Sequence, residues 1–185
     1  LMPIAHHSTF GPYQIRSWQP GDREPALALI AQVLREYSLT CEPADSDRDA
    51  RDVEACYWET GGEFWVVEAD GVLVGTAGYR PTPRGSSAVE LRKMYLLPQV
   101  RGQGLGRYLL STMESAIQQR GFAEIWLETA SVLKEAVGLY EASGYEPASG
   151  VETARCDRVY RKTLNPSQPV SFSPTKPVAS EAPEQ

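Results

Sequence analysis

The sequence predicts an α/β (α+β) domain in which helices flank a central sheet of mixed, mostly antiparallel strands. Segments rich in strand-forming residues alternate along the chain with segments whose apolar residues recur at helical spacing. One pair of predicted strands is joined by Asp70-Gly71, a dipeptide that favours a tight hairpin turn. With 185 residues, of which 42% are hydrophobic and 23% charged, the chain is sufficient for one globular domain with a buried core.

The first predicted elements are a strand and a helix. Tyr13–Trp18 alternates in the manner of a strand, and a turn follows at residues 20–22. Asp22 is a candidate N-cap for a helix that ends near Tyr37. The apolar residues of this helix recur at helical spacing, namely Ala26, Leu27, Leu29, Ile30, Val33 and Leu34.

Residues 39–54 form an acidic segment that contains Glu42, Asp45, Asp47, Asp49, Asp52 and Glu54. One interpretation is a solvated loop that leads into a short helix near Val53–Tyr57. The other is that the acidic segment borders a binding site and attracts cationic substrates. The sequence leaves both interpretations open.

The remaining strands and helices follow in alternation. Phe64–Glu68 and Val72–Tyr79 form the predicted hairpin around Asp70-Gly71, and Ala88–Leu97 is a further strand that Pro98 ends. A helix is predicted from Gly104 to Arg120, with a buried stripe formed by Leu105, Leu109, Met113 and Ile117. The last elements are a strand over Ala123–Thr129, a helix over Ser131–Ser143 and a strand over Asp157–Leu164.

The predicted domain covers residues 13–164 and is preceded by an N-terminal extension of residues 1–12. Residues 165–185 contain prolines 166, 169, 174, 177 and 183 and few large apolar side chains. This composition predicts a disordered tail, with a polyproline II docking segment as the alternative.

Composition disfavours several classes of function. A net charge of −6 and a pI of about 5.0 argue against nucleic-acid or anionic-membrane partners. His6 and His7, the two histidines, lie near the N-terminus, so a Ser-His-Asp, Cys-His or zinc site is disfavoured and no metal is expected.

The cysteines and the apolar segments bear on location. Cys41, Cys56 and Cys156 form no CxxC pair, and an odd count fits a reducing compartment better than a disulfide framework. No apolar run approaches the roughly twenty residues that span a bilayer, and the first residues lack the features of a signal peptide. These observations predict a cytoplasmic protein.

The stretch VRGQGLGRYLL, residues 100–110, has the features of an anion site. Gly102, Gly104 and Gly106 allow a close backbone approach, and the N–H groups at the start of the following helix lack intrahelical partners. The helix dipole adds partial positive charge there, and Arg101 and Arg107 flank the glycines. The alternative is a glycine-rich turn that only reverses the chain.

Two common phosphate motifs do not match this stretch. The P-loop requires GxxxxGK[ST], and no lysine followed by serine or threonine occurs at that spacing. The dinucleotide fingerprint requires GxGxxG, whereas GQGLG provides GxGxG.

Residues 91–110, LRKMYLLPQVRGQGLGRYLL, resemble the acyl-CoA-binding core of the GNAT acetyltransferase superfamily. The family pattern [RQ]xxGx[GA] between a strand and a helix is matched by Arg101, Gly104 and Gly106. A second segment, AVGLYEASGYEP, is similar to the family pattern A-x-x-L-Y-E-x-x-G-[FY] and follows at the usual distance. Its matching residues are Ala136, Tyr140, Glu141, Gly144 and Tyr145. The resemblance covers roughly residues 13–164 and is closest over residues 88–147.

The resemblance implies a GNAT fold, with six to seven strands, about four helices and a splay between strands near residues 94–96. It also implies that acetyl-CoA binds along that splay. The pyrophosphate would lie in the loop 100–107 and the pantetheine arm against Met94 and its neighbours. Where many family members have an asparagine this chain has Leu133, and Ser131 or Lys134 could take over that contact. The implied cofactor-binding residues are Met94, Tyr95, Leu96, Arg101, Gly102, Gln103, Gly104, Leu105, Gly106, Arg107, Ser131 and Lys134.

The resemblance also implies two catalytic residues. Tyr140 would donate a proton to the leaving thiolate, and Glu90 would act as a base through water. The alternatives are a packed aromatic residue for Tyr140 and an ion pair with Arg92 or Lys93 for Glu90. Tyr145 is expected to belong to the core, and Cys156 to be structural.

The function that follows is an acetyl-CoA-dependent N-acetyltransferase, in which a primary amine attacks directly in a ternary complex. A small-molecule or peptide amine is the expected partner, and the chain is expected to be a monomer or a homodimer. Arg92 or Lys93 could bind an acceptor carboxylate, whereas the acidic segment suggests a cationic acceptor. The alternatives are a non-catalytic acyl-CoA-binding module and a nucleotide-binding protein.

Overall fold

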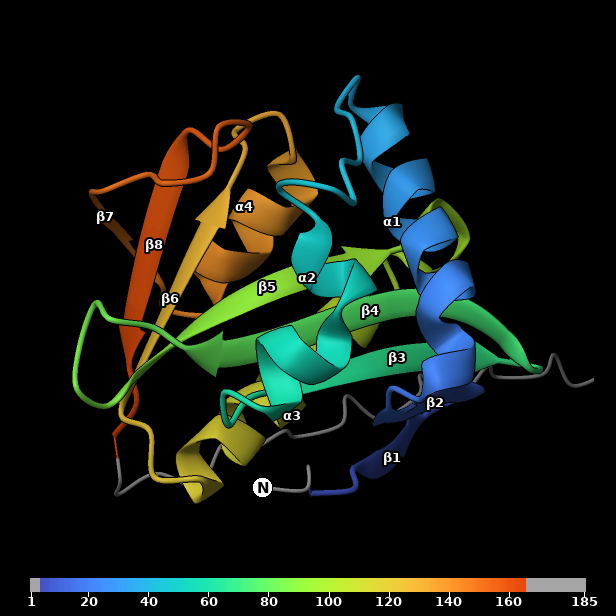
Figure 1. Cartoon of the computed structure of the whole chain (residues 1–185), viewed down its shortest axis with the longest axis horizontal. Coiled ribbons are helices and arrows are strands. Elements are labelled where there is room, and N and C mark those ends of the chain that lie inside the picture. The colour runs from blue at the N-terminus through green and yellow to red at the C-terminus, as the bar shows by residue number, and fades with distance from the viewer. Residues whose placement is uncertain (1–3, 166–185) are drawn as a thin grey trace, which may run out of the picture.

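A computed structural model describes residues 4–165 and contains one sheet (Figure 1). Within these residues the sheet has eight strands in the order β1-β2-β3-β4-β5-β6-β8-β7. The strands are β1 His7–Phe10, β2 Tyr13–Ser17, β3 Glu63–Ala69, β4 Val72–Pro81, β5 Ala88–Leu96, β6 Glu124–Thr129, β7 Glu146–Ala148 and β8 Arg158–Thr163. The helices are α1 Arg23–Glu36, α2 Arg48–Arg51, α3 Leu105–Gln119 and α4 Lys134–Ala142, with short helical turns at Pro20–Asp22, Glu54–Trp58 and Pro98–Val100.

The predicted fold class is confirmed. Neighbouring strands are antiparallel except for β5 and β6, which pair in parallel because α3 connects them. At the predicted hairpin, Asp70 and Gly71 have φ values of 51° and 77°, as a tight two-residue turn requires. Every strand and helix expected from the sequence is present, with ends that differ by a few residues.

The described residues contain eight strands, more than the six to seven expected, and the two additional strands are β1 and β7. β1 lies inside the predicted N-terminal extension, so the sheet begins earlier in the chain than the sequence indicates. β7 contains Pro147, which is tolerated because β7 is an edge strand. Both strands are short and mostly exposed, so neither carries a clear hydrophobic pattern. The predicted disordered tail lies outside the described residues.

Helices cover both faces of the sheet. In Figure 1, α1 and α2 lie in front of the central strands and α3 lies behind them. The predicted stripe of α3 is confirmed, because Leu105, Leu109, Met113 and Ile117 are at most 1% exposed and belong to the main core. α1 contributes to the core from the opposite face through Leu29. No helix in the described part of the chain has the length and apolar character needed to cross a bilayer.

The sheet splits between β5 and β6. Their pairing runs from Ala88 and Glu124 to Leu91 and Leu127, although both strands continue beyond that point. The register between β4 and β5 also shifts here, and Lys93 adopts a left-handed φ of 53°. An extra residue of this kind bends a strand and increases its twist. The splay expected near residues 94–96 is therefore present, and the sequence alone gives no sign of the bulge at Lys93.

Candidate active site

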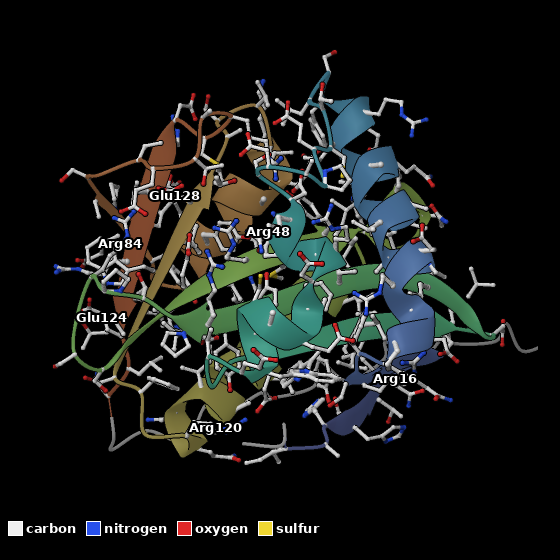
Figure 2. All side chains as sticks on the ribbon, viewed as in Figure 1. Arg16, Arg48, Arg84, Arg120, Glu124 and Glu128 are labelled. Carbon is white, nitrogen blue, oxygen red and sulfur yellow. The ribbon has the colours of Figure 1, made fainter. Side chains whose placement is uncertain are left out.

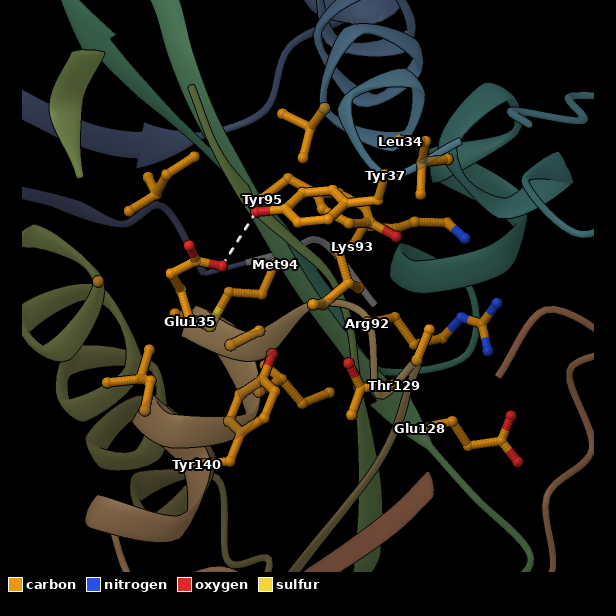
Figure 3. A pocket seen from close by; sticks show the side chains of 18 of the residues that line it. Leu34, Tyr37, Arg92, Lys93, Met94, Tyr95, Glu128, Thr129, Glu135 and Tyr140 are labelled. Carbon is orange, nitrogen blue, oxygen red and sulfur yellow. Dashed lines mark hydrogen bonds between the residues drawn. The ribbon is translucent and has the colours of Figure 1, made fainter. Parts of the chain in front are cut away.

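A cavity of about 400 Å³ opens where β5 and β6 separate (Figure 3). Its walls come from the end of α1, the second half of β5, the glycine-rich loop, the end of β6, the first turns of α4 and the segment 153–156. These segments lie far apart in the chain and meet only in the folded molecule. The predicted site residues in its lining are Glu90, Met94, Tyr95, Leu96, Arg101, Gly102, Gly104, Gly106, Arg107 and Tyr140.

The glycine-rich loop forms one end of the cavity. Gly102 and Gly104 have positive φ values of 73° and 85°, a conformation that favours glycine, and Gly104 is the N-cap of α3. Gly106 lies inside α3, where an added Cβ would be 3.4 Å from Leu139 and 3.5 Å from Leu96. The open end of α3 therefore faces a space lined by small residues and by Arg101 and Arg107.

Four of the predicted cofactor residues lie outside the cavity lining. Leu105 is 1% exposed and packs in the core, and the side chain of Gln103 accepts a hydrogen bond of 3.1 Å from the Tyr13 hydroxyl. Ser131 donates to Asp157 through its backbone N–H and its hydroxyl, at 2.7 and 2.6 Å. Lys134 is exposed. On this side of the cavity the wall is formed by Leu133 and its neighbours on α4.

Arg101 links the loop to β5 and α1. Its Nε donates to the carbonyl oxygen of Leu96 at 2.9 Å, and its two terminal nitrogens contact the carboxylate of Glu36 at 3.0 and 3.3 Å. The N–H of Leu97 donates to Val74 of β4. The Leu96 carbonyl belongs to the same trans peptide group as this N–H, and the two bonds point in opposite directions, so the carbonyl faces the gap left by β6.

Tyr140 stands on α4 with its hydroxyl directed into the cavity (Figure 3). The residue is 6% exposed, and its ring packs edge-on against Tyr145 with 5.7 Å between centroids. Burial raises the pKa of Tyr140, and the nearby Tyr95 and Cys156 raise it further. The phenol is therefore protonated at neutral pH. Tyr145 belongs to the main core, as expected.

Glu90 lines the cavity and forms the ion pair that the sequence offered as an alternative. Arg92 Nη1 donates to Glu90 Oε1 at 2.9 Å, and Arg80 approaches the other oxygen at 3.8 Å. Lys93, the other partner considered, contacts different carboxylates. Glu90 thus presents a carboxylate that a neighbouring guanidinium holds at the cavity wall.

Two carboxylates of the acidic segment, Asp47 and Asp49, are neither solvated nor free to attract cations. Asp47 is 0% and Asp49 4% exposed, and both are neutralised by cations of this chain. Lys93 Nζ lies 2.8 Å from Asp47 and 3.2 Å from Asp49, while Arg155 contacts both oxygens of Asp47 at 2.6 and 2.7 Å. Both sequence interpretations are therefore wrong for these two residues, because their partners come from distant parts of the chain.

The bulge in β5 explains how two consecutive residues, Arg92 and Lys93, both contact the carboxylate of Asp49. Arg92 Nε donates to Asp49 at 2.7 Å, and Lys93 contacts the other oxygen of the same carboxylate. Regular alternation would place the two side chains on opposite faces of the sheet, and the left-handed Lys93 removes that alternation. Tyr57 also donates to Asp49, at 2.6 Å.

These contacts shift the pKa values of the buried carboxyls. Burial raises the pKa of Asp47, but the hydrogen bond from Arg155 and the charge of Lys93 outweigh it and hold the pKa well below its ordinary value. Burial also raises the pKa of Asp49, but the charges of Lys93 and Arg92 outweigh it, so the pKa of Asp49 is lowered as well. Both carboxyls are ionised in the folded protein at neutral pH.

Glu128 is a cavity residue that the sequence interpretation missed. Its carboxylate accepts hydrogen bonds from the backbone N–H groups of Glu152 and Thr153. It also forms an ion pair with Arg84 at 3.1 Å (Figure 2). Arg84 also donates to the carbonyl of Gly150. The segment 150–156, which carries Arg155 and Cys156 to the cavity, is fixed in this way. The sequence signal that could have identified Glu128 is its position at the end of the predicted strand WLET.

The cavity cations differ in their remaining capacity for hydrogen bonding. Lys93 Nζ donates a hydrogen bond to the carbonyl of Ser46 and forms ion pairs with Asp47 and Asp49. Within residues 4–165, Arg92 uses Nε and Nη1, while Nη2 has no hydrogen-bond partner. Arg92 and Lys93 are both candidate partners for a carboxylate of the acceptor, and within the described residues Arg92 has a free nitrogen, Nη2, for such a contact.

Residues 30–145 match the sequence profile of the acetyltransferase (GNAT) family. The match covers more than half of the chain and includes the glycine-rich loop, the splayed strand and Tyr140. The chain therefore belongs to the GNAT family of N-acetyltransferases, as the resemblance of its motifs indicates.

Individual relatives agree with this assignment. Over 127 residues the chain is 42% identical to a protein of Escherichia coli (strain K12) named uncharacterized N-acetyltransferase YjgM, covering 66% of this chain and 75% of the relative. It is 31% identical over 121 residues to a Mus musculus protein named probable N-acetyltransferase family 8 member 5, covering 64% of this chain. The chain spans about half the length of this mouse relative, 52%.

Solved structures share the fold. A GNAT-family acetyltransferase from Staphylococcus aureus Mu50 superposes with a TM-score of 0.76 at 20% identity, covering 83% of this chain and 99% of that one. A protein named YncA from Salmonella typhimurium, solved with acetyl-CoA as its cofactor, superposes with a TM-score of 0.65 at 22% identity, covering 83% and 95%.

Proposed function

We propose that this protein transfers the acetyl group of acetyl-CoA to a primary amine by direct attack in a ternary complex. The observation that carries the proposal is the continuity of one cavity. It joins the glycine-rich loop at the start of α3 to the unpaired half of β5 and to the hydroxyl of Tyr140. An anion site, a strand edge and a proton donor thus line a single space.

The cofactor would lie along that space. The pyrophosphate would accept hydrogen bonds from the N–H groups at the start of α3, where the helix dipole and Arg107 favour negative charge. The amide groups of the pantetheine arm would pair with β5, whose residues 92–96 have no partner in β6. A backbone N–H at the bulge could polarise the thioester carbonyl.

The transfer step needs two proton movements. The amine nitrogen attacks the carbonyl carbon, a C–N bond forms, and the C–S bond then breaks with its electron pair on sulfur. Tyr140, which is protonated at neutral pH, would give its proton to the leaving thiolate. Glu90, held at the wall by Arg92, would take the proton of the amine through water.

Cys156 lines the same cavity and bears on the choice between direct and two-step transfer. Burial raises the pKa of its thiol to about 11. The thiol is therefore protonated at neutral pH and is a weak nucleophile. This favours direct attack by the amine over an acetylated cysteine intermediate.

Release of free thiol from acetyl-CoA tests this function. The full chain would be incubated with acetyl-CoA and a panel of amines that includes amino acids, polyamines and peptides with free N-termini. Acceptor-dependent release supports the proposal. Binding of CoA without release on any amine would instead indicate a non-catalytic module, and tighter binding of ATP than of CoA in calorimetry would indicate a nucleotide-binding protein.

A further inference from the structure

A hydrogen bond crosses the cavity from one wall to the other. The hydroxyl of Tyr37, at the end of α1, donates to Oε2 of Glu135 in the first turn of α4 at 3.1 Å (Figure 3). The two residues are 98 positions apart in the sequence, and both line the cavity. α1 packs against β4 and β5, whereas α4 directly follows β6 in the chain, so the contact links the two sides of the gap between β5 and β6.

The bridge is connected to the glycine-rich loop. Arg101 Nη1 donates to the Tyr37 hydroxyl at 3.3 Å, and its guanidinium lies 6.0 Å from the centre of the Tyr37 ring. The same guanidinium holds Glu36 and the Leu96 carbonyl. One side chain of the loop therefore supports Tyr37 and occupies a backbone acceptor of β5 that faces the cavity.

The bridge lies across the route of an extended ligand. Gly104, Gly106 and Tyr140 all line the cavity, and Tyr37 and Glu135 line it as well, one at the end of α1 and the other in α4. In Figure 3 the bond between Tyr37 and Glu135 passes above the space into which Tyr140 points. The contact is solvent-accessible, so water can compete with it and it can break without exposing a core.

We propose that Tyr37 and Glu135 form a strap across the acyl-CoA cleft that opens to admit the cofactor and re-forms over its pantetheine arm. This inference rests on the proposed function, because it takes the ligand of the cavity to be acetyl-CoA. Arrival of the arm would displace Arg101 from the Leu96 carbonyl. Tyr37 and Glu135 are thus positioning residues that hold the cofactor in place.

A strap of this kind makes a specific kinetic prediction. If it must open for entry and for exit, its loss lowers the barrier in both directions. Removing one exposed hydrogen bond to a carboxylate, worth about 1 kcal/mol, corresponds to about a five-fold change in rate. We expect Tyr37→Phe to raise both the association and the dissociation rate constants of CoA about five-fold and to change Kd by less than about two-fold.

Surface plasmon resonance of CoA over the immobilised full chain measures these constants. Glu135→Ala removes the acceptor of the strap, whereas Tyr37→Phe removes its donor and also an acceptor of Arg101. Both substitutions break the strap, so Glu135→Ala should also raise both rate constants, and the double variant should show no increase beyond that of Tyr37→Phe. Glu135→Gln keeps an acceptor oxygen and should lie closer to the wild type. Tyr160→Phe is the matched control, since its hydroxyl donates to Glu141 of α4 at 2.7 Å away from the cavity lining.

The outcomes separate the strap from other roles. Unchanged rate constants in Tyr37→Phe would overturn it, as would multiplicative effects of the two single substitutions in the double variant. A faster dissociation alone, with weaker affinity, would reduce Tyr37 to a cofactor contact and also overturn the strap. A wild-type chain that binds no CoA would overturn the proposed function itself, which is a different result.

Discussion

Lys93 and Asp47 form an ion pair with 2.8 Å between Nζ and Oδ1, although the two side chains are only 3% and 0% exposed. Removing two charges from water is costly, and the cost is offset here by further contacts. Asp47 also receives Arg155 and the backbone N–H of Glu42. The pair fastens the acidic segment to the bulge of β5, beside the cavity.

Asp47→Asn should therefore destabilise the fold. The substitution keeps the shape of the side chain but leaves Lys93 and Arg155 with one carboxylate fewer in a buried position. We expect a loss of about 3 kcal/mol in the free energy of unfolding, measured by urea denaturation. Asp52→Asn is the control, since Asp52 pairs with Arg48 and Arg51 at the exposed surface and its substitution should cause a much smaller loss. Equal losses would contradict the role of burial.

The same network predicts acid sensitivity. Because the pKa values of Asp47 and Asp49 are lower in the folded than in the unfolded chain, their contribution to stability is complete above the ordinary carboxyl value of about 3.9. It is lost as the pH falls through the folded-state values. The free energy of unfolding should thus decrease as the pH falls below about 4, and less steeply in Asp47→Asn than in the wild type. Parallel curves for the two proteins would show that Asp47 is not responsible.

Tyr140→Phe separates catalysis from binding. The variant retains the ring that packs against Tyr145 but has no proton for the leaving thiolate. We expect kcat to fall about a hundredfold while the Kd for CoA stays within about two-fold, as measured by thiol release and calorimetry. A large loss of affinity for CoA with an unchanged kcat would make Tyr140 a structural residue.

Glu90→Gln tests the proposed base. The variant should lower kcat at saturating amine about a hundredfold, because an amide cannot accept the proton. Arg92→Gln breaks the same ion pair but keeps the carboxyl group of Glu90, which Arg80 still approaches at 3.8 Å, so its kcat should fall much less. Similar losses in both variants would mean that the ion pair, and not proton transfer, accounts for the effect.

Gly104→Asp would place a carboxylate at the N-cap of α3, beside the expected phosphates, and should weaken CoA binding about tenfold or more. Gly104 has a φ of 85°, so the substitution also strains the backbone. Gly104→Asn controls for that strain, since asparagine tolerates the left-handed region and carries no charge. Calorimetry with CoA should show clearly tighter binding in the asparagine variant, and equal affinities would argue against a phosphate at this position.

The sequence predicts the fold class well because the signals that define it are local. Period-two and helical patterns, the Asp70-Gly71 turn and the buried stripe of α3 all lie within short segments. The glycine-rich loop and Tyr140 are also local signals, and they meet in one cavity. By contrast, β1 and β7 are short edge strands without a periodic pattern, and they are found only in the structure.

The charge pairing around the site could not be predicted in the same way. Nothing near Asp47 in the sequence indicates that Arg155 neutralises it, and nothing near Tyr37 indicates Glu135. No local sequence pattern indicates the bulge at Lys93 either, because the bulge depends on how β4 and β5 pair. Contacts of this kind depend on tertiary geometry, which determines whether an acidic segment attracts substrate or is satisfied internally.

The contact between Asp47 and Arg155 joins residues 108 positions apart in the chain. Closing so long a loop costs more entropy than closing the β3–β4 hairpin, so we expect this part of the molecule to be completed late in folding. The walls of the cavity would then also be the first region to open in the native state. Native-state hydrogen exchange should find faster exchange in residues 42–50 and 150–157 than in the central strands, so that the ability to turn over substrate is lost before the fold itself.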